Sequence, residues 1–204
     1  MSFVQRSGTP EPGVPPLRDG VFCLLSGKPG ESAMVVIITG ATHTGKTLLA
    51  QRLLETYHFP YLSVDLLKMG LIRSGRAGDL TPYDDEALEG CLWPIVREMI
   101  KTAVENGQSL IVEGGYIPHD WKASFEESYI KEIRYYCLVM SKQYIMKNFS
   151  KIKMYANVME KRISDDGCTM QYLMEENERY RSMCEAYGYA CILVEDDYHP
   201  DIVL

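Results

Sequence analysis

The sequence predicts an α/β domain, a three-layer fold in which a mainly parallel sheet of five strands carries helices on both faces. From residue 34 onward, short runs rich in β-branched residues alternate with longer stretches of helical spacing, which is typical of this class. Hydrophobic residues make up 46% and charged residues 24% of the 204 residues, a composition typical of globular proteins. A glycine-rich loop also separates the first strand-like run from the first helix-like run, as in many parallel-sheet proteins.

The first 33 residues differ in composition from the rest of the chain. They hold five of the ten prolines and five of the sixteen glycines, and their charges cancel. We expect residues 1–33 to form a tail of the kind that is often disordered, and residues 34–204 to form the domain. The whole net charge of -7 then belongs to the domain.

Within the domain, strands are predicted where short apolar runs end in polar or glycine residues, and helices where apolar residues recur every three or four positions. In the helix expected at 84–105, Leu88, Leu92 and Met99 follow this spacing, and Pro94 should bend or restart the helix. The predicted strands are 35–39, 61–64, 110–113, 133–140 and 190–194. The predicted helices are 46–57, 65–73, 84–105, 119–128, 142–162 and 169–187.

Residues 40–47 read Gly-Ala-Thr-His-Thr-Gly-Lys-Thr, which matches the P-loop pattern G-x-x-x-x-G-K-[ST] between a strand and a helix. Glycines let the backbone wrap so that its N–H groups face phosphate oxygens, and the helix N-terminus favours an anion. Lys46 would neutralise the β- and γ-phosphates, and Thr47 would place its hydroxyl on Mg²⁺. The predicted nucleotide-binding residues are Gly40, Thr42, His43, Thr44, Gly45, Lys46, Thr47 and Leu48.

Two further features narrow the class of P-loop protein. The chain has no Asn-Lys-x-Asp segment of the kind that reads guanine in GTPases. The strand at 110–113 ends in a single acid followed by Gly114 and Gly115. With the five strands and the P-loop, this resembles the nucleoside monophosphate kinase-like group, which includes adenylate, shikimate and gluconate kinases and zeta-toxin-like and 2-phosphoglycerate-kinase-like proteins. The resemblance implies an ATP-dependent, Mg²⁺-requiring kinase that phosphorylates a small metabolite or nucleotide.

The resemblance also implies roles for residues after the second strand. In this group that strand ends in an acid facing the acceptor, and Asp65 stands there. Asp65 would orient or deprotonate the acceptor hydroxyl or bind Mg²⁺, although an Asp at this position also suits a helix N-cap. Arg73 and Arg76 follow the next helix, where they would bind the acceptor or remain as surface residues.

Glu113 ends a strand that we expect beside the P-loop strand, at the edge where ligands collect in parallel sheets. Its carboxylate would hold the Mg²⁺ water shell together with Thr47, or anchor the turn at Gly114 and Gly115. These two glycines would let the acceptor or a phosphate approach the backbone closely, or simply form a turn.

The resemblance implies that the segment at about 142–168 is a helical lid that closes over the triphosphate. Residues 142–162 carry a local charge of +5, with six basic residues against Glu160. Arg162 is the predicted catalytic lid cation, with Arg179 as a further candidate. The other interpretation is a solvated helix face. The lid of adenylate kinase is richer in arginine, which argues against AMP as the acceptor.

Composition limits partners and location. The acidic balance disfavours a nucleic-acid polymer as a partner, and no apolar run is long enough for a membrane span. The N-terminus lacks the apolar core of a secretion signal, so we expect a cytoplasmic protein. The scattered cysteines and histidines do not have zinc-ligand spacing. A kinase acting on a sugar nucleotide and an ATP-binding regulatory module remain alternatives, and the oligomeric state stays open.

Overall fold

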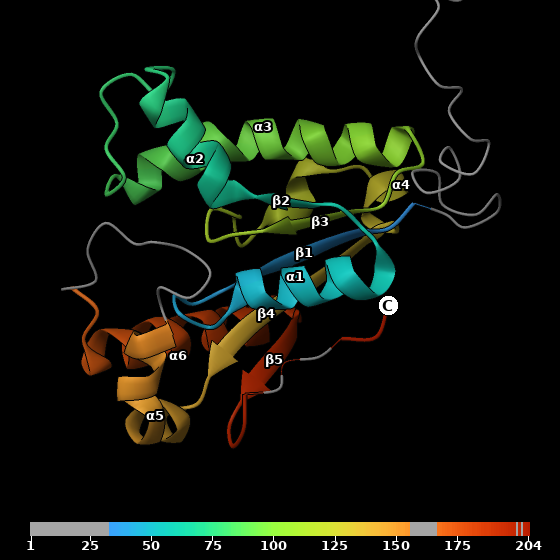
Figure 1. Cartoon of the computed structure of the whole chain (residues 1–204). Helices are drawn as coiled ribbons and strands as arrows, with labels where there is room; N and C mark the ends of the chain where they lie inside the picture. Colours follow the sequence, from blue (N-terminus) through green and yellow to red (C-terminus); the bar gives the residue numbers. More distant parts are fainter. Residues whose placement is uncertain (1–32, 156–166, 199, 201) are drawn as a thin grey trace, which may run out of the picture. The chain divides into compact units, whose positions relative to one another are not determined.

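A computed structural model describes residues 33–155, 167–198, 200 and 202–204. Within these residues five strands form one sheet in the order β2-β3-β1-β4-β5, and every neighbouring pair is parallel (Figure 1). The predicted fold class is therefore confirmed. The strands are β1 (Val35–Gly40), β2 (Tyr61–Ser63), β3 (Leu110–Glu113), β4 (Ile133–Met140) and β5 (Ala190–Val194).

The central strand β1 explains why helices cover both faces of the sheet. All six of its residues are buried, and its side chains alternate between two hydrophobic clusters. Val35 and Ile37 belong to the cluster that contains Leu88 and Leu92, whereas Val36 belongs to the cluster that contains Leu49 and Leu53. Because a parallel strand must be shielded from water on each side, this run of β-branched residues requires a helix layer above and below.

The helices follow the predicted positions closely, with one exception. The predicted helix at 119–128 is wrong: the chain forms a 3₁₀ turn, η2 (Trp121–Ser124), and a short helix, α4 (Glu127–Ile130). Phe125 lies between them in an extended conformation, with φ -129° and ψ 148°. The ring of Trp121 stacks on Tyr135, and the ring of Phe125 lies edge-on to Trp93. Burying both rings among these neighbours overrides the local helical preference.

The other helices are α1 (Lys46–Tyr57), α2 (Val64–Arg73), α3 (Asp85–Glu105), α5 (Lys142–Tyr155) and α6 (Met170–Tyr187). Pro94 was expected to bend or restart α3, and the helix continues through Pro94 without restarting. Pro94 is exposed, and the residue four positions earlier is the exposed Gly90. Water can therefore reach the carbonyl group that loses its hydrogen bond, and no side chain at Gly90 obstructs the proline ring.

Two predictions fall partly or wholly outside the described residues. The tail was predicted at 1–33, of which 1–32 lie outside, and the lid includes residues 156–166, which also lie outside. Helix α5 forms the start of the predicted lid segment. None of the described helices is both long enough and apolar enough to cross a membrane.

Candidate active site

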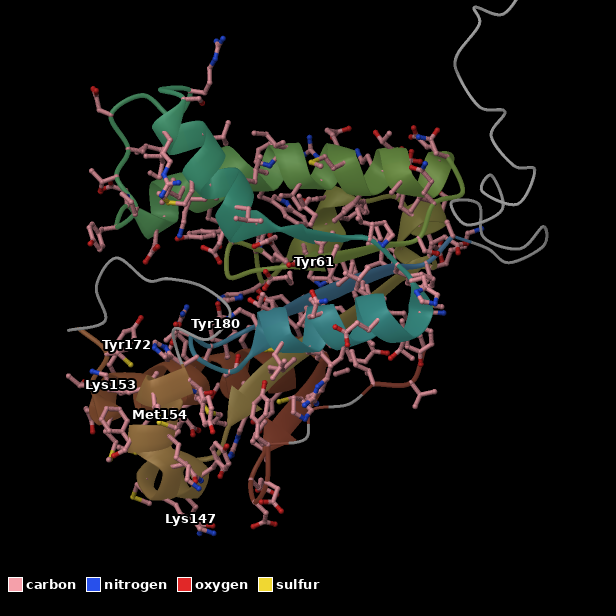
Figure 2. All side chains as sticks on the ribbon, in the orientation of Figure 1. Tyr61, Lys147, Lys153, Met154, Tyr172 and Tyr180 are labelled. Atoms are coloured by element: carbon pink, nitrogen blue, oxygen red, sulfur yellow. The ribbon has the colours of Figure 1, made fainter. Side chains whose placement is uncertain are left out.

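A cleft of about 1140 Å³ opens where β1 and β3 end, at the carboxyl edge of the sheet. Its walls come from the loop after β1, from α2 and α3, and from α5 and α6. Ligand sites typically measure about 300–1,000 Å³, so this cleft has room for a nucleotide and a second small molecule. Figure 2 shows the side chains of these elements, with Tyr172 and Tyr180 of α6 labelled.

The P-loop lies in this cleft, between the end of β1 and the start of α1. Gly45 precedes α1 in the left-handed conformation, with φ 78°, and no side chain caps the helix N-terminus. A Cβ at Gly45 would lie 1.6 Å from the hydroxyl oxygen of Tyr198, so this position requires glycine. The uncapped N–H groups of the first turn of α1 form the kind of site that binds an anion.

Two hydroxyl groups support the loop. The buried Thr44 side chain donates a hydrogen bond to the carbonyl oxygen of Ala41, at 2.7 Å. The Tyr198 hydroxyl donates to the carbonyl oxygen of Thr44, at 2.8 Å. The loop is thus braced from within and from the segment after β5. Burial raises the pKa of Tyr198 to about 12, so the phenol stays protonated at neutral pH.

The predicted nucleotide-binding residues lie together. Lys46 Nζ donates to the carbonyl oxygens of Gly40, at 3.1 Å, and Ala41, at 2.8 Å, so the ammonium lies over the loop. Of the predicted set, Thr44 does not line the cleft; the others do, namely Gly40, Thr42, His43, Gly45, Lys46, Thr47 and Leu48.

Two oxygen ligands suited to Mg²⁺ meet at the base of the loop. Glu113 ends β3 opposite Ile38 of β1, and its side chain is buried, with 1% of the residue exposed. The Thr47 hydroxyl donates to Glu113 Oε2 at 3.3 Å. Among the described residues, no group of three or more His, Cys, Asp or Glu side chains could hold a metal by itself. Because Mg²⁺ usually takes one or two protein oxygens together with waters and substrate phosphates, this pair fits that ion.

Asp65 also lines the cleft, in the first turn of α2. It is not the N-cap of α2, because Ser63 has that role and its side chain accepts a hydrogen bond from the Leu66 N–H. The Asp65 carboxylate forms an ion pair with Lys68 Nζ at 2.7 Å.

Lys68 links Asp65 to α3. Its ammonium donates to the Tyr116 hydroxyl at 3.1 Å, which in turn donates to the Asp85 carboxylate at 2.8 Å. Burial acts to lower the pKa of Lys68, but the charge of Asp65 and the hydrogen bonds outweigh it and raise the pKa. Burial raises the pKa of Tyr116 to about 12, against the opposing effect of Lys68. Both groups therefore keep their protons at neutral pH. Through Lys68 and Tyr116, the side chains of Asp65 and Asp85 belong to one hydrogen-bonded network.

The remaining predicted residues are divided between the cleft and its surroundings. Arg73 and Gly115 line the cleft, whereas Arg76 is exposed and is not among the lining residues. A Cβ at Gly114 would lie 2.7 Å from Val64 Cβ, so Gly114 permits the close approach of α2. Arg162 lies outside the described residues.

Several cleft residues were missed by sequence reasoning. Lys68 and Tyr116 belong to the network above, and Lys151 of α5 lines the cleft. From α6, the Glu176 carboxylate accepts a hydrogen bond from the backbone N–H of Thr42. Arg179, which the sequence analysis named as a candidate cation, also lines the cleft and lies over the Tyr180 ring. Lys68 had a usable signal, its position three residues after Asp65 on a predicted helix, and Lys151 lies in the basic stretch at 142–162.

No family model matches the sequence, and no curated protein matches it. Similar solved structures include kinases of the shikimate and gluconate type, the group that the sequence resembles. Shikimate kinase from Bacteroides thetaiotaomicron is 13% identical with a TM-score of 0.47, and the match covers 79% of this chain and 86% of that one. Shikimate kinase from Aquifex aeolicus is 12% identical with a TM-score of 0.43, and the match covers 79% of this chain and 85% of that one.

A gluconokinase from Sinorhizobium meliloti is 12% identical with a TM-score of 0.38, over 75% of this chain and 94% of that one. At these identities and TM-scores the likeness carries no information about the reaction. The case for a function therefore depends on the P-loop and the residues that face it.

Proposed function

We propose that this protein is a Mg²⁺-dependent kinase that transfers the γ-phosphoryl group of ATP to a hydroxyl group of a small metabolite or nucleotide. The observation that carries the proposal is the P-loop, which opens into a cleft that is also lined by the Thr47–Glu113 pair and by Asp65. The P-loop suits a polyphosphate, the Thr47–Glu113 pair suits Mg²⁺, and the Asp65 carboxylate suits an acceptor hydroxyl.

On the nucleotide side, the loop N–H groups would bind phosphate oxygens, and Lys46 would exchange its two carbonyl partners for the β- and γ-phosphates. Thr47 and Glu113 would hold Mg²⁺, which when bound neutralises part of the phosphate charge. Lys151 and Arg179 line the cleft and would stabilise charge on the transferring group, together with the predicted lid cation Arg162.

On the acceptor side, Asp65 would accept a hydrogen bond from the attacking hydroxyl, and Arg73 would bind another part of the acceptor. The ion pair with Lys68 holds the Asp65 carboxylate in place, so that it can orient the hydroxyl. The bond between the γ-phosphorus and the bridging oxygen breaks, an acceptor O–P bond forms, and Asp65 receives the proton as transfer completes. Phosphoryl transfer needs little base assistance before the transition state, so a paired carboxylate suffices.

The test compares Lys46→Ala with Lys147→Ala. Lys147 is an exposed lysine of α5 and does not line the cleft (Figure 2). ADP release is measured over a panel of sugars, sugar nucleotides, nucleoside monophosphates and hydroxy acids. We expect Lys46→Ala to lose about 100-fold or more of the turnover while remaining folded by circular dichroism, and Lys147→Ala to retain it.

Undiminished turnover by Lys46→Ala would refute the proposed mechanism. Tight ATP binding with no turnover on any acceptor would instead indicate a regulatory module.

A further inference from the structure

A carboxylate of the protein itself contacts the loop that suits phosphate. Glu176 Oε2 accepts a hydrogen bond from the Thr42 backbone N–H at 2.9 Å, across 134 residues of sequence. Thr42 lies within the P-loop, and both residues line the cleft. Backbone N–H groups of such a loop are donors for phosphate oxygens, so the carboxylate uses a donor that an incoming phosphate would otherwise use.

The position of Glu176 is fixed by its neighbour in the sequence. Asn177 is buried, with 2% of the residue exposed, and its Oδ1 accepts a hydrogen bond from the Met140 N–H at 2.6 Å. Its Nδ2 donates to the carbonyl oxygen of Leu173 at 2.7 Å. The bond to Met140 attaches α6 to the end of β4, which pairs directly with β1, the strand that leads into the P-loop.

The same face of α6 forms the wall of the cleft. Tyr172 and Tyr180, both labelled in Figure 2, lie one turn before and one turn after Glu176. All three residues line the cleft. The charge of Glu176 contributes to raising the pKa of both phenols, although burial is the larger cause, so the carboxylate lies near both rings. The anchored helix therefore holds Glu176 toward the P-loop.

We propose that Glu176 is an internal competitor for the phosphate site and so sets the affinity for the nucleotide. A polyphosphate that reaches Thr42 must displace a hydrogen-bonded carboxylate. The negative charge of that carboxylate also repels the phosphates when it stays nearby. Both effects weaken nucleotide binding relative to a loop without the carboxylate. This inference rests on the proposed function, because it requires that the P-loop bind a nucleotide.

The experiment measures the Kd of ADP and of a non-hydrolysable ATP analogue, each with Mg²⁺, by isothermal titration calorimetry. Glu176→Gln removes the charge and keeps a hydrogen-bond acceptor, whereas Glu176→Ala removes both. Glu178→Gln is the matched control, because it removes the same charge from the same helix at a residue that pairs with Lys142 at 3.4 Å.

We expect Glu176→Gln to bind at least one of the nucleotides about tenfold more tightly than the wild type. Glu176→Ala should bind at least as tightly as Glu176→Gln, and Glu178→Gln should stay within about twofold of the wild type. If the wild type binds nucleotide and both Glu176 variants bind it no more tightly than the wild type does, the inference is overturned. The proposed function would still stand. Failure of the wild type and of every variant to bind either nucleotide overturns the proposed function, and the inference with it.

Discussion

The first residue of the P-loop offers the sharpest test of how the fold positions the site. Gly40 ends β1 with φ 131°, and a Cβ there would lie 2.0 Å from the carbonyl oxygen and 2.6 Å from the nitrogen of Leu138. These are backbone atoms of β4, which cannot turn aside as the end of a side chain can. Gly40→Ala must therefore move the loop away from the sheet or strain both strands.

The cost has two parts, and a second glycine separates them. Left-handed backbone strain costs about 1–3 kcal/mol and overpacking another 1–3 kcal/mol, so Gly40→Ala should destabilise the protein by about 4 kcal/mol. Gly107 follows α3 with φ 66° and has open space where a Cβ would be. Gly107→Ala therefore meets only the backbone strain and should cost about 1–2 kcal/mol.

Urea unfolding of the two variants measures the difference. With a slope of about 2 kcal/mol per molar urea, an extra cost of about 2 kcal/mol lowers the midpoint of Gly40→Ala by about 1 M relative to Gly107→Ala. Equal midpoints would show that β4 does not restrict the start of the loop, and the reasoning would be wrong.

Two further predictions concern the loop and its metal ligands. Tyr198→Phe loses the hydrogen bond to the Thr44 carbonyl and should lower the free energy of unfolding by about 1 kcal/mol in urea titrations. Because burial raises the pKa of Tyr198 from 10.0 to about 12, the folded state retains a proton that the unfolded chain releases, so wild-type stability should fall between pH 10 and pH 12. Tyr198→Phe should flatten that fall, and an unchanged pH profile would contradict the assignment. Glu113→Gln should raise the Mg²⁺ concentration for half-maximal turnover about tenfold, and an unaltered requirement would exclude Glu113 as a ligand of the ion or its water shell.

The elements that could be predicted from the sequence are those specified by local pattern. The strand Leu110–Glu113 is found at its predicted bounds because an apolar run ends there in Glu113 and two glycines. Helix α1 likewise begins and ends where predicted, since the P-loop defines its start. The segment at 119–128 could not be predicted in this way, because its conformation depends on aromatic partners from α3 and β4.

The site shows the same division. The P-loop residues and Glu113 could be placed from the sequence, because the pattern and the parallel sheet together bring them to one edge. The hydrogen bond between Tyr116 and Asp85 spans 31 residues, and the one between Thr42 and Glu176 spans 134, with no motif at either end. Such contacts follow from how α3 and α6 pack on the sheet, which a single sequence does not specify.

The charge of the cleft connects these observations. Among the described residues, five lysines and arginines line the cleft against eight aspartates and glutamates. An excess of acids is unfavourable for a polyanion, so nucleotide binding here must depend on the backbone N–H groups of the P-loop and on a cation brought by the ligand. The Thr47–Glu113 pair would recruit that cation, and the Glu176 carboxylate opposes a nucleotide that arrives without it. The acidic balance therefore predicts that the Kd for ADP rises steeply when Mg²⁺ is removed, and that Glu176→Gln reduces this dependence.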